Sequence, residues 1–176
     1  MKKKLITILV VFAITSVILI SFKSIYRIHD PTKISLGSDG RIYIAGTDLL
    51  YNGLYRDTVN VIVEFTVVNG VKNGSFRTYF LSGQIEKEGF IKNNKNIGEW
   101  KYYYENGQIE TKGYFHENIP YGQWKSFYKN GNLKTIGTYR WGEQHGPWEV
   151  YNQDGKLANI FYYDEGKLIQ QAFNNT

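Results

Sequence analysis

The chain repeats itself at a fixed interval of 24 residues, and this period constrains its fold more than any other feature. A glycine opens each copy, and a second glycine follows nine residues later. The opening glycines are Gly74, Gly98, Gly122 and Gly146, and the second glycines are Gly83, Gly107, Gly131 and Gly155. Self-similarity at such a period indicates an array in which each unit packs on its neighbours. Residues 74–169 are therefore predicted to form four repeats, 74–97, 98–121, 122–145 and 146–169.

Each repeat is predicted to be a β-hairpin. Residues 99–104 are rich in aromatic side chains, as strands are, and residues 109–115 give the returning strand. Asn106-Gly107 between them is typical of a tight turn, and residues 116–121 then lead to the next copy. Four hairpins in succession predict an all-β fold, an antiparallel meander of about eight strands.

Two aromatic positions recur in every repeat, three residues apart. The third position holds Phe76, Trp100, Trp124 and Trp148, and the sixth holds Tyr79, Tyr103, Phe127 and Tyr151. In a regular strand these positions point to opposite faces. Either a bulge near Lys101-Tyr102 brings them to one face, or each face of the sheet carries its own row of aromatic residues. A single-layer sheet needs such rows, because no second layer buries its side chains.

The N-terminal segment predicts a membrane anchor. Lys2-Lys3-Lys4 form a short basic tail, residues 1–4, and residues 5–22 follow without charge or proline. This run is long for a signal peptide and close to the lower limit for a membrane-spanning helix. We expect an uncleaved single-pass helix, with a cleaved signal and a secreted product as the alternative. The basic residues before the helix place the N-terminus in the cytoplasm and the C-terminal domain outside a bacterial cell membrane.

The net charge of +5 belongs to the N-terminus rather than to the repeats. Residues 1–30 carry five basic groups and one acidic group, whereas residues 31–176 carry sixteen basic and fifteen acidic groups. A nucleic-acid-binding domain should itself carry a basic face, so no nucleic-acid partner is expected. The chain has no cysteine, which excludes disulfides and thiolate metal sites.

The remaining segments flank the array. Residues 23–40 are expected to be a linker, and residues 41–73 a degenerate β cap that covers the apolar end of the first regular repeat. Residues 170–176 are expected to be a tail.

No set of residues predicts catalysis, a cofactor or a metal. His29 lies in the linker, and His116 and His145 occupy different positions in their repeats, so they do not form a row across the sheet. The glycines mark turns and none precedes a helix, which argues against a phosphate-binding loop. We therefore expect a protein that is not an enzyme.

Residues 137–155 resemble the MORN repeat, in a form similar to its bacterial variant. The shared pattern is Gly-x-Trp-x-x-aromatic-x-x-x-Gly, here from Gly146 to Gly155, and it recurs in phase over residues 74–169. The resemblance implies a β-hairpin meander used for protein interaction, in membrane-associated scaffolds or in antitoxin-like bacterial proteins. It supplies no residue signature for either use.

Lys101 to Ile109 also resemble the Gram-positive cell-wall-binding repeats that recognise choline or glucans, although the frame here is longer. Aromatic residues bind quaternary ammonium groups and sugars well, so a cell-wall glycan is an alternative partner.

The sequence thus predicts a membrane-anchored scaffold that binds another protein outside the cytoplasm, with an antitoxin- or immunity-like role as one use. Candidate contacts are three tyrosines at positions that vary within the repeat frame, together with a further tryptophan: Tyr102, Tyr104, Tyr128 and Trp141. The framework glycines and Trp100, Trp124 and Trp148 are expected to be structural.

Overall fold

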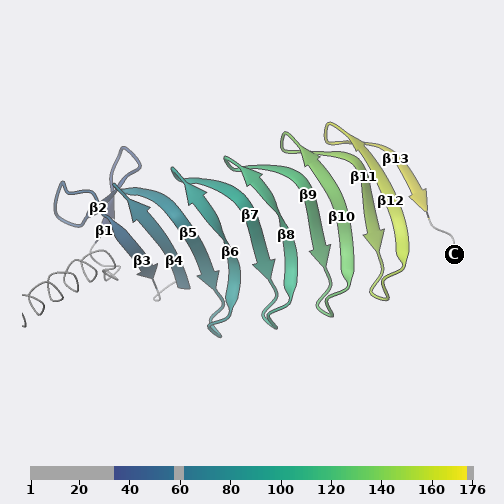
Figure 1. Ribbon diagram of the computed structural model, residues 1–176, viewed down its shortest axis with the longest axis horizontal. Helices are drawn as coiled ribbons and strands as arrows, with labels where there is room; N and C mark the ends of the chain where they lie inside the picture. Colours follow the sequence, from purple (N-terminus) through teal and green to yellow (C-terminus); the bar gives the residue numbers. More distant parts are fainter. Residues whose placement is uncertain (1–33, 58–61, 174–176) are drawn as a thin grey trace, which may run out of the picture.

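The computed structural model describes residues 34–57 and 62–173, which contain thirteen β-strands (Figure 1). The strands are β1 (Ile34–Leu36), β2 (Ile42–Ile44), β3 (Gly53–Asp57), β4 (Ile62–Val68), β5 (Val71–Tyr79), β6 (Ile85–Lys92), β7 (Lys95–Tyr103), β8 (Ile109–His116), β9 (Ile119–Phe127), β10 (Leu133–Arg140), β11 (Glu143–Tyr151), β12 (Leu157–Asp164) and β13 (Lys167–Phe173). In these two ranges no helix is long and apolar enough to cross a membrane. The expected anchor, residues 5–22, lies outside the described residues.

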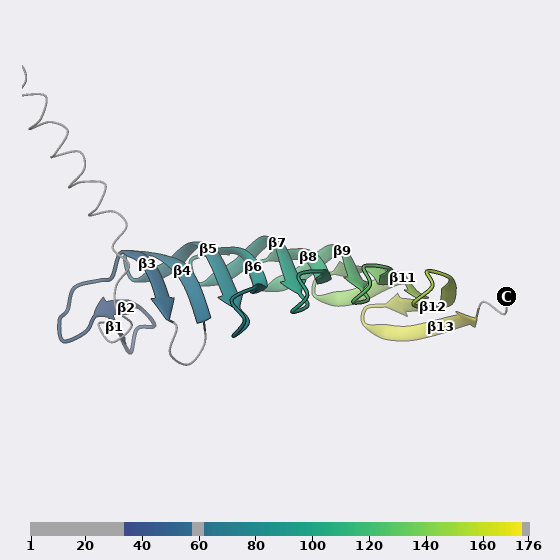
Figure 2. The same ribbon diagram turned by 90° about the horizontal axis from the view of Figure 1, so that it is seen from below.

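Strands β3 to β13 form one sheet in which every strand pairs with its neighbours in sequence. All of these pairs are antiparallel, and the four predicted repeats supply β5 to β12. Seen from below, the strands form a single row, with β1 and β2 at its N-terminal end (Figure 2). The predicted antiparallel meander is confirmed.

The hairpins are joined by two kinds of turn, and their places are the reverse of those predicted. The segment at Asn106-Gly107 is a five-residue loop, residues 104–108, in which the Gly107 amide donates to the Tyr104 carbonyl at 2.9 Å. The tight turn is Glu117-Asn118, where both residues have positive φ, 51° and 72°. Such a two-residue turn matches the twist of the strands that it joins. Residues 119–121, expected in a connection, therefore belong to strand β9.

The two aromatic rows occupy opposite faces of the sheet. Between β7 and β8, Tyr102 lies opposite Thr111 and Tyr103 opposite Ile109, so the extra residue is Glu110 on β8. Strand β7 keeps its alternation, which puts Trp100 and Tyr103 on different faces. We call the face with Phe76, Trp100, Trp124 and Trp148 the tryptophan face, and the face with Tyr79, Tyr103, Phe127 and Tyr151 the tyrosine face.

Aromatic rings are in continuous contact along the tryptophan face. Successive ring centroids are separated by 4.7 to 6.4 Å, in tilted, stacked or edge-to-face arrangements that aromatic pairs favour. The row runs through Tyr55, Phe65, Phe76, Trp100, Phe115, Trp124, Tyr139, Trp148 and Tyr163. It provides the packing that a single-layer sheet otherwise lacks.

The framework glycines all have a backbone conformation that L-residues rarely adopt. Their φ values lie between 66° and 132°. They are Gly74, Gly83, Gly98, Gly107, Gly122, Gly131, Gly146 and Gly155. Gly98 stands where the β6–β7 register shifts, and Gly107 closes the five-residue loop, so each repeat needs one glycine for a bulge and one for a loop.

The N-terminal end of the sheet is covered by the β1–β2 hairpin. Ile42 and Tyr51 form a buried cluster with Tyr55, Phe65 and Val67 of the sheet. The Ile42 amide donates to the Gly70 carbonyl at 2.7 Å, which fixes the hairpin to the β4–β5 turn. This hairpin lies where the sequence predicts a cap, and its first strand extends into the expected linker. The expected tail boundary at residue 170 falls inside β13 and is corrected to Phe173, because residues 167–173 pair with β12.

Candidate functional site

Two of the predicted contact residues hold neighbouring repeats together. The Tyr104 hydroxyl donates to the Phe127 carbonyl at 2.9 Å, and the Tyr128 hydroxyl donates to the Tyr151 carbonyl at 2.7 Å. Each bond crosses from one repeat to the next, about one period along the chain. These hydroxyl groups therefore act within the array.

Tyr102 lies on the tryptophan face, beside the cap hairpin. Together with Trp100, Lys72 and Lys87 it lines a hollow of about 430 Å³. Burial raises the pKa of the Tyr102 hydroxyl above its ordinary value. The two lysines make this hollow a poor receptor for a cationic ligand such as choline.

Trp141, the fourth predicted contact, is the most exposed tryptophan of the described chain, with 84% of its surface accessible. It occupies the first position of the tight turn between β10 and β11, with φ of 53°. The equivalent turns carry Asn93, Glu117 and Glu165 at this position. Positive φ is unusual for a large side chain, so Trp141 is held in an unfavourable conformation without being buried.

An apolar hollow of about 500 Å³ lies beside Trp141. Its lining includes His116, Ile119, Tyr121 and Arg140. The strand alternation and the opposition of Tyr121 to Tyr114 place this hollow on the tyrosine face. Thus the four predicted contacts lie in three different places, and only Trp141 lies on an exposed apolar surface.

We define the aromatic patch as Tyr114, His116, Ile119, Tyr121 and Trp141. The rings of Tyr114 and Tyr121 are 6.0 Å apart, and those of His116 and Tyr121 are 6.3 Å apart and nearly perpendicular. Tyr114, Ile119 and Tyr121 are 41%, 45% and 43% exposed. Clustered exposed apolar groups of this kind mark interaction sites.

Sequence reasoning missed most of this patch. Ile119 and Tyr121 were expected in a connection, where the direction of a side chain cannot be inferred. Once Glu117-Asn118 is recognised as a two-residue turn, His116 and Ile119 become opposed residues on one face. The signal in the sequence is Glu117-Asn118, two polar residues between the two strands, of which asparagine readily accepts a positive φ.

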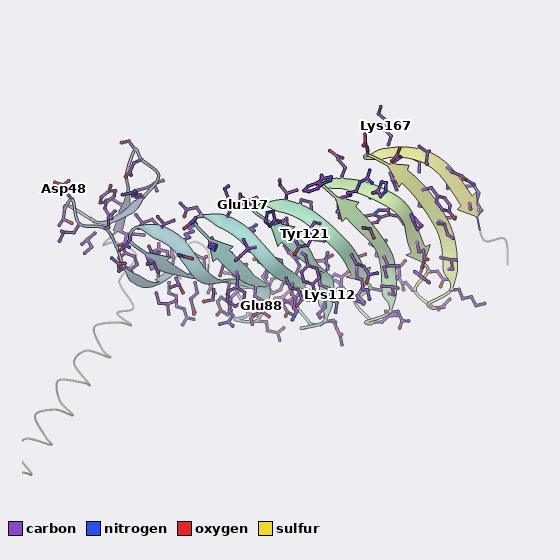
Figure 3. The ribbon with its side chains drawn as sticks, turned by 45° about the horizontal axis from the view of Figure 1, so that its top comes forward. Asp48, Glu88, Lys112, Glu117, Tyr121 and Lys167 are labelled. Atoms are coloured by element: carbon purple, nitrogen blue, oxygen red, sulfur yellow. The ribbon has the colours of Figure 1, made fainter. Side chains whose placement is uncertain are left out.

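Charged residues cross the tyrosine face next to the patch. From β4 to β9 the directly opposed residues are Glu64, Arg77, Glu88, Lys101, Lys112 and Lys125. Arg77 pairs with Glu88 at 3.2 Å, and Lys101 pairs with Glu99 at 3.2 Å. Figure 3 marks Glu88, Lys112 and Tyr121 on the central strands.

The hydrogen bond between Tyr103 and Glu88 shifts the pKa of both groups. Partial burial alone would raise the pKa of Glu88, but hydrogen bonds from Tyr103 and Arg77 outweigh it and hold that pKa below its ordinary value. Burial, followed by the hydrogen bond to Glu88, raises the pKa of Tyr103 to about 12. Glu88 is therefore ionised and Tyr103 protonated at neutral pH.

The described residues contain no group of three or more histidine or acidic side chains that could hold a metal ion. His116 contacts Tyr121, and the His145 Nδ1 atom lies 3.4 Å from an Asp164 carboxylate oxygen. What the surface offers is rings, an apolar hollow and fixed charges, which are the elements of a binding site.

The fold defines a class of protein, the single-layer arrays of repeated β-hairpins, in which each unit packs only on its neighbours. Four consecutive segments match the family described as MORN repeat variant, over residues 72–93, 97–117, 120–140 and 144–161. The chain belongs to this MORN repeat variant family. No curated protein matched the chain.

Proposed function

We propose that the chain is a non-enzymatic, membrane-anchored scaffold that binds another protein outside the cytoplasm through the aromatic patch. The observation that carries this proposal is Trp141, which is 84% exposed beside an apolar hollow and held at positive φ. An unfavourable backbone conformation at an exposed ring supports a functional role for that ring.

The composition of the patch supports a protein partner. Tryptophan, tyrosine and arginine are the residue types that dominate binding energy at protein interfaces. Trp141, Tyr121 and Arg140 line one hollow, and Tyr114 extends the surface across β8. A typical interface takes about 800 Å² from each partner, an area that the neighbouring strands provide around the hollow.

The membrane part of the proposal rests on the N-terminal sequence. Residues 5–22 are uncharged and follow three lysines, a pattern typical of a helix whose preceding segment stays in the cytoplasm. The repeats would then face the outside of the membrane. An antitoxin- or immunity-like role is one use of such a scaffold, and it requires that cells lacking the protein become sensitive to a specific toxin.

The wall-binding alternative finds less support. It needs exposed aromatic groups that stack on sugars or surround an ammonium group. The Tyr104 and Tyr128 hydroxyls instead donate to backbone carbonyls, and Lys129 and Lys134 lie over their rings at 5.8 and 5.7 Å. Sedimentation of the full chain with washed cell walls, in the presence and absence of choline or soluble glucan, separates the two functions.

The proposed function is tested by photo-crosslinking in cells that express the full chain. A benzophenone amino acid replaces Tyr121 in one variant and Leu81 in a control. Leu81 is 91% exposed and lies in the β5–β6 loop, away from the patch. We expect a discrete crosslinked protein from position 121 and none from position 81, with the product lost when Trp141→Ala is added. No product at position 121, or the same product at both positions, would overturn the proposal.

A further inference from the structure

The row of charges on the tyrosine face changes at its centre from alternating sign to positive only. From Glu64 to Lys101 the directly opposed residues alternate in sign, as cross-strand pairs favour. Lys112 then lies opposite Lys101 on one side and opposite Lys125 on the other. Three positive residues thus follow one another across β7, β8 and β9.

Lys112 and Lys125 have no acidic partner in the described part of the chain. Lys101 is paired with Glu99, whereas neither Lys112 nor Lys125 forms an ion pair among the described residues. Glu88 lies two strands from Lys112, on the far side of Lys101, a separation of about 10 Å at the usual strand spacing.

On the other side, Ile136 is opposed to Lys125 and separates it from Glu149. The Glu149 carboxylate accepts a hydrogen bond from the Tyr151 hydroxyl. Like charges placed directly opposite each other destabilise a sheet. The array therefore carries an unfavourable lysine pair, and the nearest carboxylate on this face, Glu99 on the diagonal across β7–β8, is already paired with Lys101 at 3.2 Å.

The lysine pair adjoins the aromatic patch. Tyr114 follows Lys112 by two residues on β8, and Tyr121, opposed to Tyr114, lies on the same face. His116, which lines the apolar hollow, is four residues from Lys112, or about 13 Å along a strand. An extended peptide covers this distance in four residues, with both side chains on one side.

We propose that the aromatic patch and the Lys112–Lys125 pair together bind an extended, acidic segment of the partner protein. An apolar side chain of that segment occupies the hollow beside Trp141, and a carboxylate about four residues away lies over the two lysines. This inference rests on the proposed function and specifies the chemistry of the partner.

The surrounding charges favour a discrete acidic segment over a uniformly anionic surface. Glu99, opposed to Tyr114, and Glu88 lie on the same face as the lysine pair. A lipid bilayer rich in anionic headgroups, or a nucleic acid, would bring negative charge against these glutamates as well as against the lysines. A peptide places its carboxylates only where the lysines lie.

The test uses the purified full chain in a neutral detergent and fluorescently labelled peptides. One peptide has a phenylalanine with glutamates four and six positions later in a Gly/Ser background, and its counterpart has lysines in place of the glutamates. We expect the glutamate peptide to bind about tenfold more tightly at low salt, as close charge pairs across interfaces allow. Lys112→Glu/Lys125→Glu should invert the order of the two peptides.

Lys156→Glu/Lys167→Glu is the matched control, because it makes the same change of net charge at residues that neither line the hollow nor belong to the lysine pair (Figure 3 marks Lys167). It should keep the wild-type order. Equal binding of both peptides, or an unchanged order in the Lys112→Glu/Lys125→Glu variant, would overturn the inference. So would a wild-type chain that binds neither peptide.

Failure of this inference is distinguishable from failure of the proposed function. If position 121 crosslinks a protein in cells but the order of the peptides does not invert, the chain binds a partner of different chemistry. If the order of the two peptide affinities inverts but no protein is crosslinked, the surface recognises acidic segments and the proposed cellular function is wrong.

Discussion

Gly113 and Trp124 are in direct contact across the β8–β9 pair, with the indole lying over the glycine backbone. A Cβ atom at Gly113 would lie 2.1 Å from Trp124 Cδ2, far inside any permitted contact. Gly89 has the same relationship with Trp100, and Gly137 with Trp148. This third glycine of the repeat is therefore required by the ring of the following repeat rather than by a turn.

Gly113→Ala should destabilise the array by about 1–3 kcal/mol, because the added methyl group forces the Trp124 ring out of its packed position. Urea unfolding of the full chain in detergent, followed by tryptophan fluorescence, measures the change. The double variant with Trp124→Ala is the control. If Gly113→Ala lowers the free energy of unfolding as much in the Trp124→Ala background as in the wild type, the contact between Gly113 and Trp124 is not the cause of the loss.

Tyr104→Phe and Tyr128→Phe should each lower the free energy of unfolding by about 0.5–1.5 kcal/mol, the usual contribution of one hydrogen bond. Each change removes a donor to a carbonyl of the next repeat and keeps the ring. The same unfolding measurement reports the loss, and the crosslink from position 121 should be unaffected. A selective loss of crosslinking would place these tyrosines in the binding surface instead.

Trp141→Asn should stabilise the chain by about 1 kcal/mol, because asparagine followed by glycine suits a turn with two positive φ angles. It should also reduce crosslinking from position 121, since it removes one wall of the hollow. Glu165→Asn makes the same change at the equivalent position of the β12–β13 turn, where it also removes the 3.8 Å ion pair between Glu165 and Arg140. It should raise stability and, because it leaves the Trp141 wall of the hollow in place, reduce crosslinking less than Trp141→Asn does. A destabilised Trp141→Asn variant would show that the ring contributes to folding.

Glu88→Gln should flatten the acid limb of the stability profile. The pKa of Glu88 is lowered in the folded chain, so its contribution is present above the ordinary value near 4.5 and is lost as pH falls below it. Unfolding measured from pH 6 to pH 3 should show a shallower slope for Glu88→Gln than for the wild type. Parallel curves would mean that the carboxylate gains nothing from Tyr103 and Arg77.

The strand framework was predictable because it depends on patterns that recur. Glycine and aromatic residues at fixed places in a period of 24 residues identify the hairpins. The sequence left two arrangements of Trp100 and Tyr103 open, and the β7–β8 register shows that they lie on opposite faces. The exchange of the two turn types was not predictable from Asn106-Gly107 alone. That dipeptide suits both a tight turn and a loop that ends in a residue with positive φ.

The proposed binding surface was harder to predict, because it depends on departures from the repeat. Trp141 was a candidate contact, and the structure places it at an exposed turn. Tyr104 and Tyr128 were candidates because the residue type at their repeat position varies. Their hydroxyls instead form hydrogen bonds to backbone carbonyls of the next repeat. The lysine pair emerges only from the register of β8 and β9, which single strands do not reveal.

Phe161 replaces the third glycine in the last repeat, and the residue at the next tryptophan position is Ala172. No indole follows, so Phe161 is free of the constraint that fixes Gly89, Gly113 and Gly137. A glycine of this kind is thus required by the ring of the following unit, and an aromatic side chain stands in its place where that ring is absent. Each hairpin lengthens the sheet by about 10 Å, the width of two strands, so the reach of such an array is set by the number of its units.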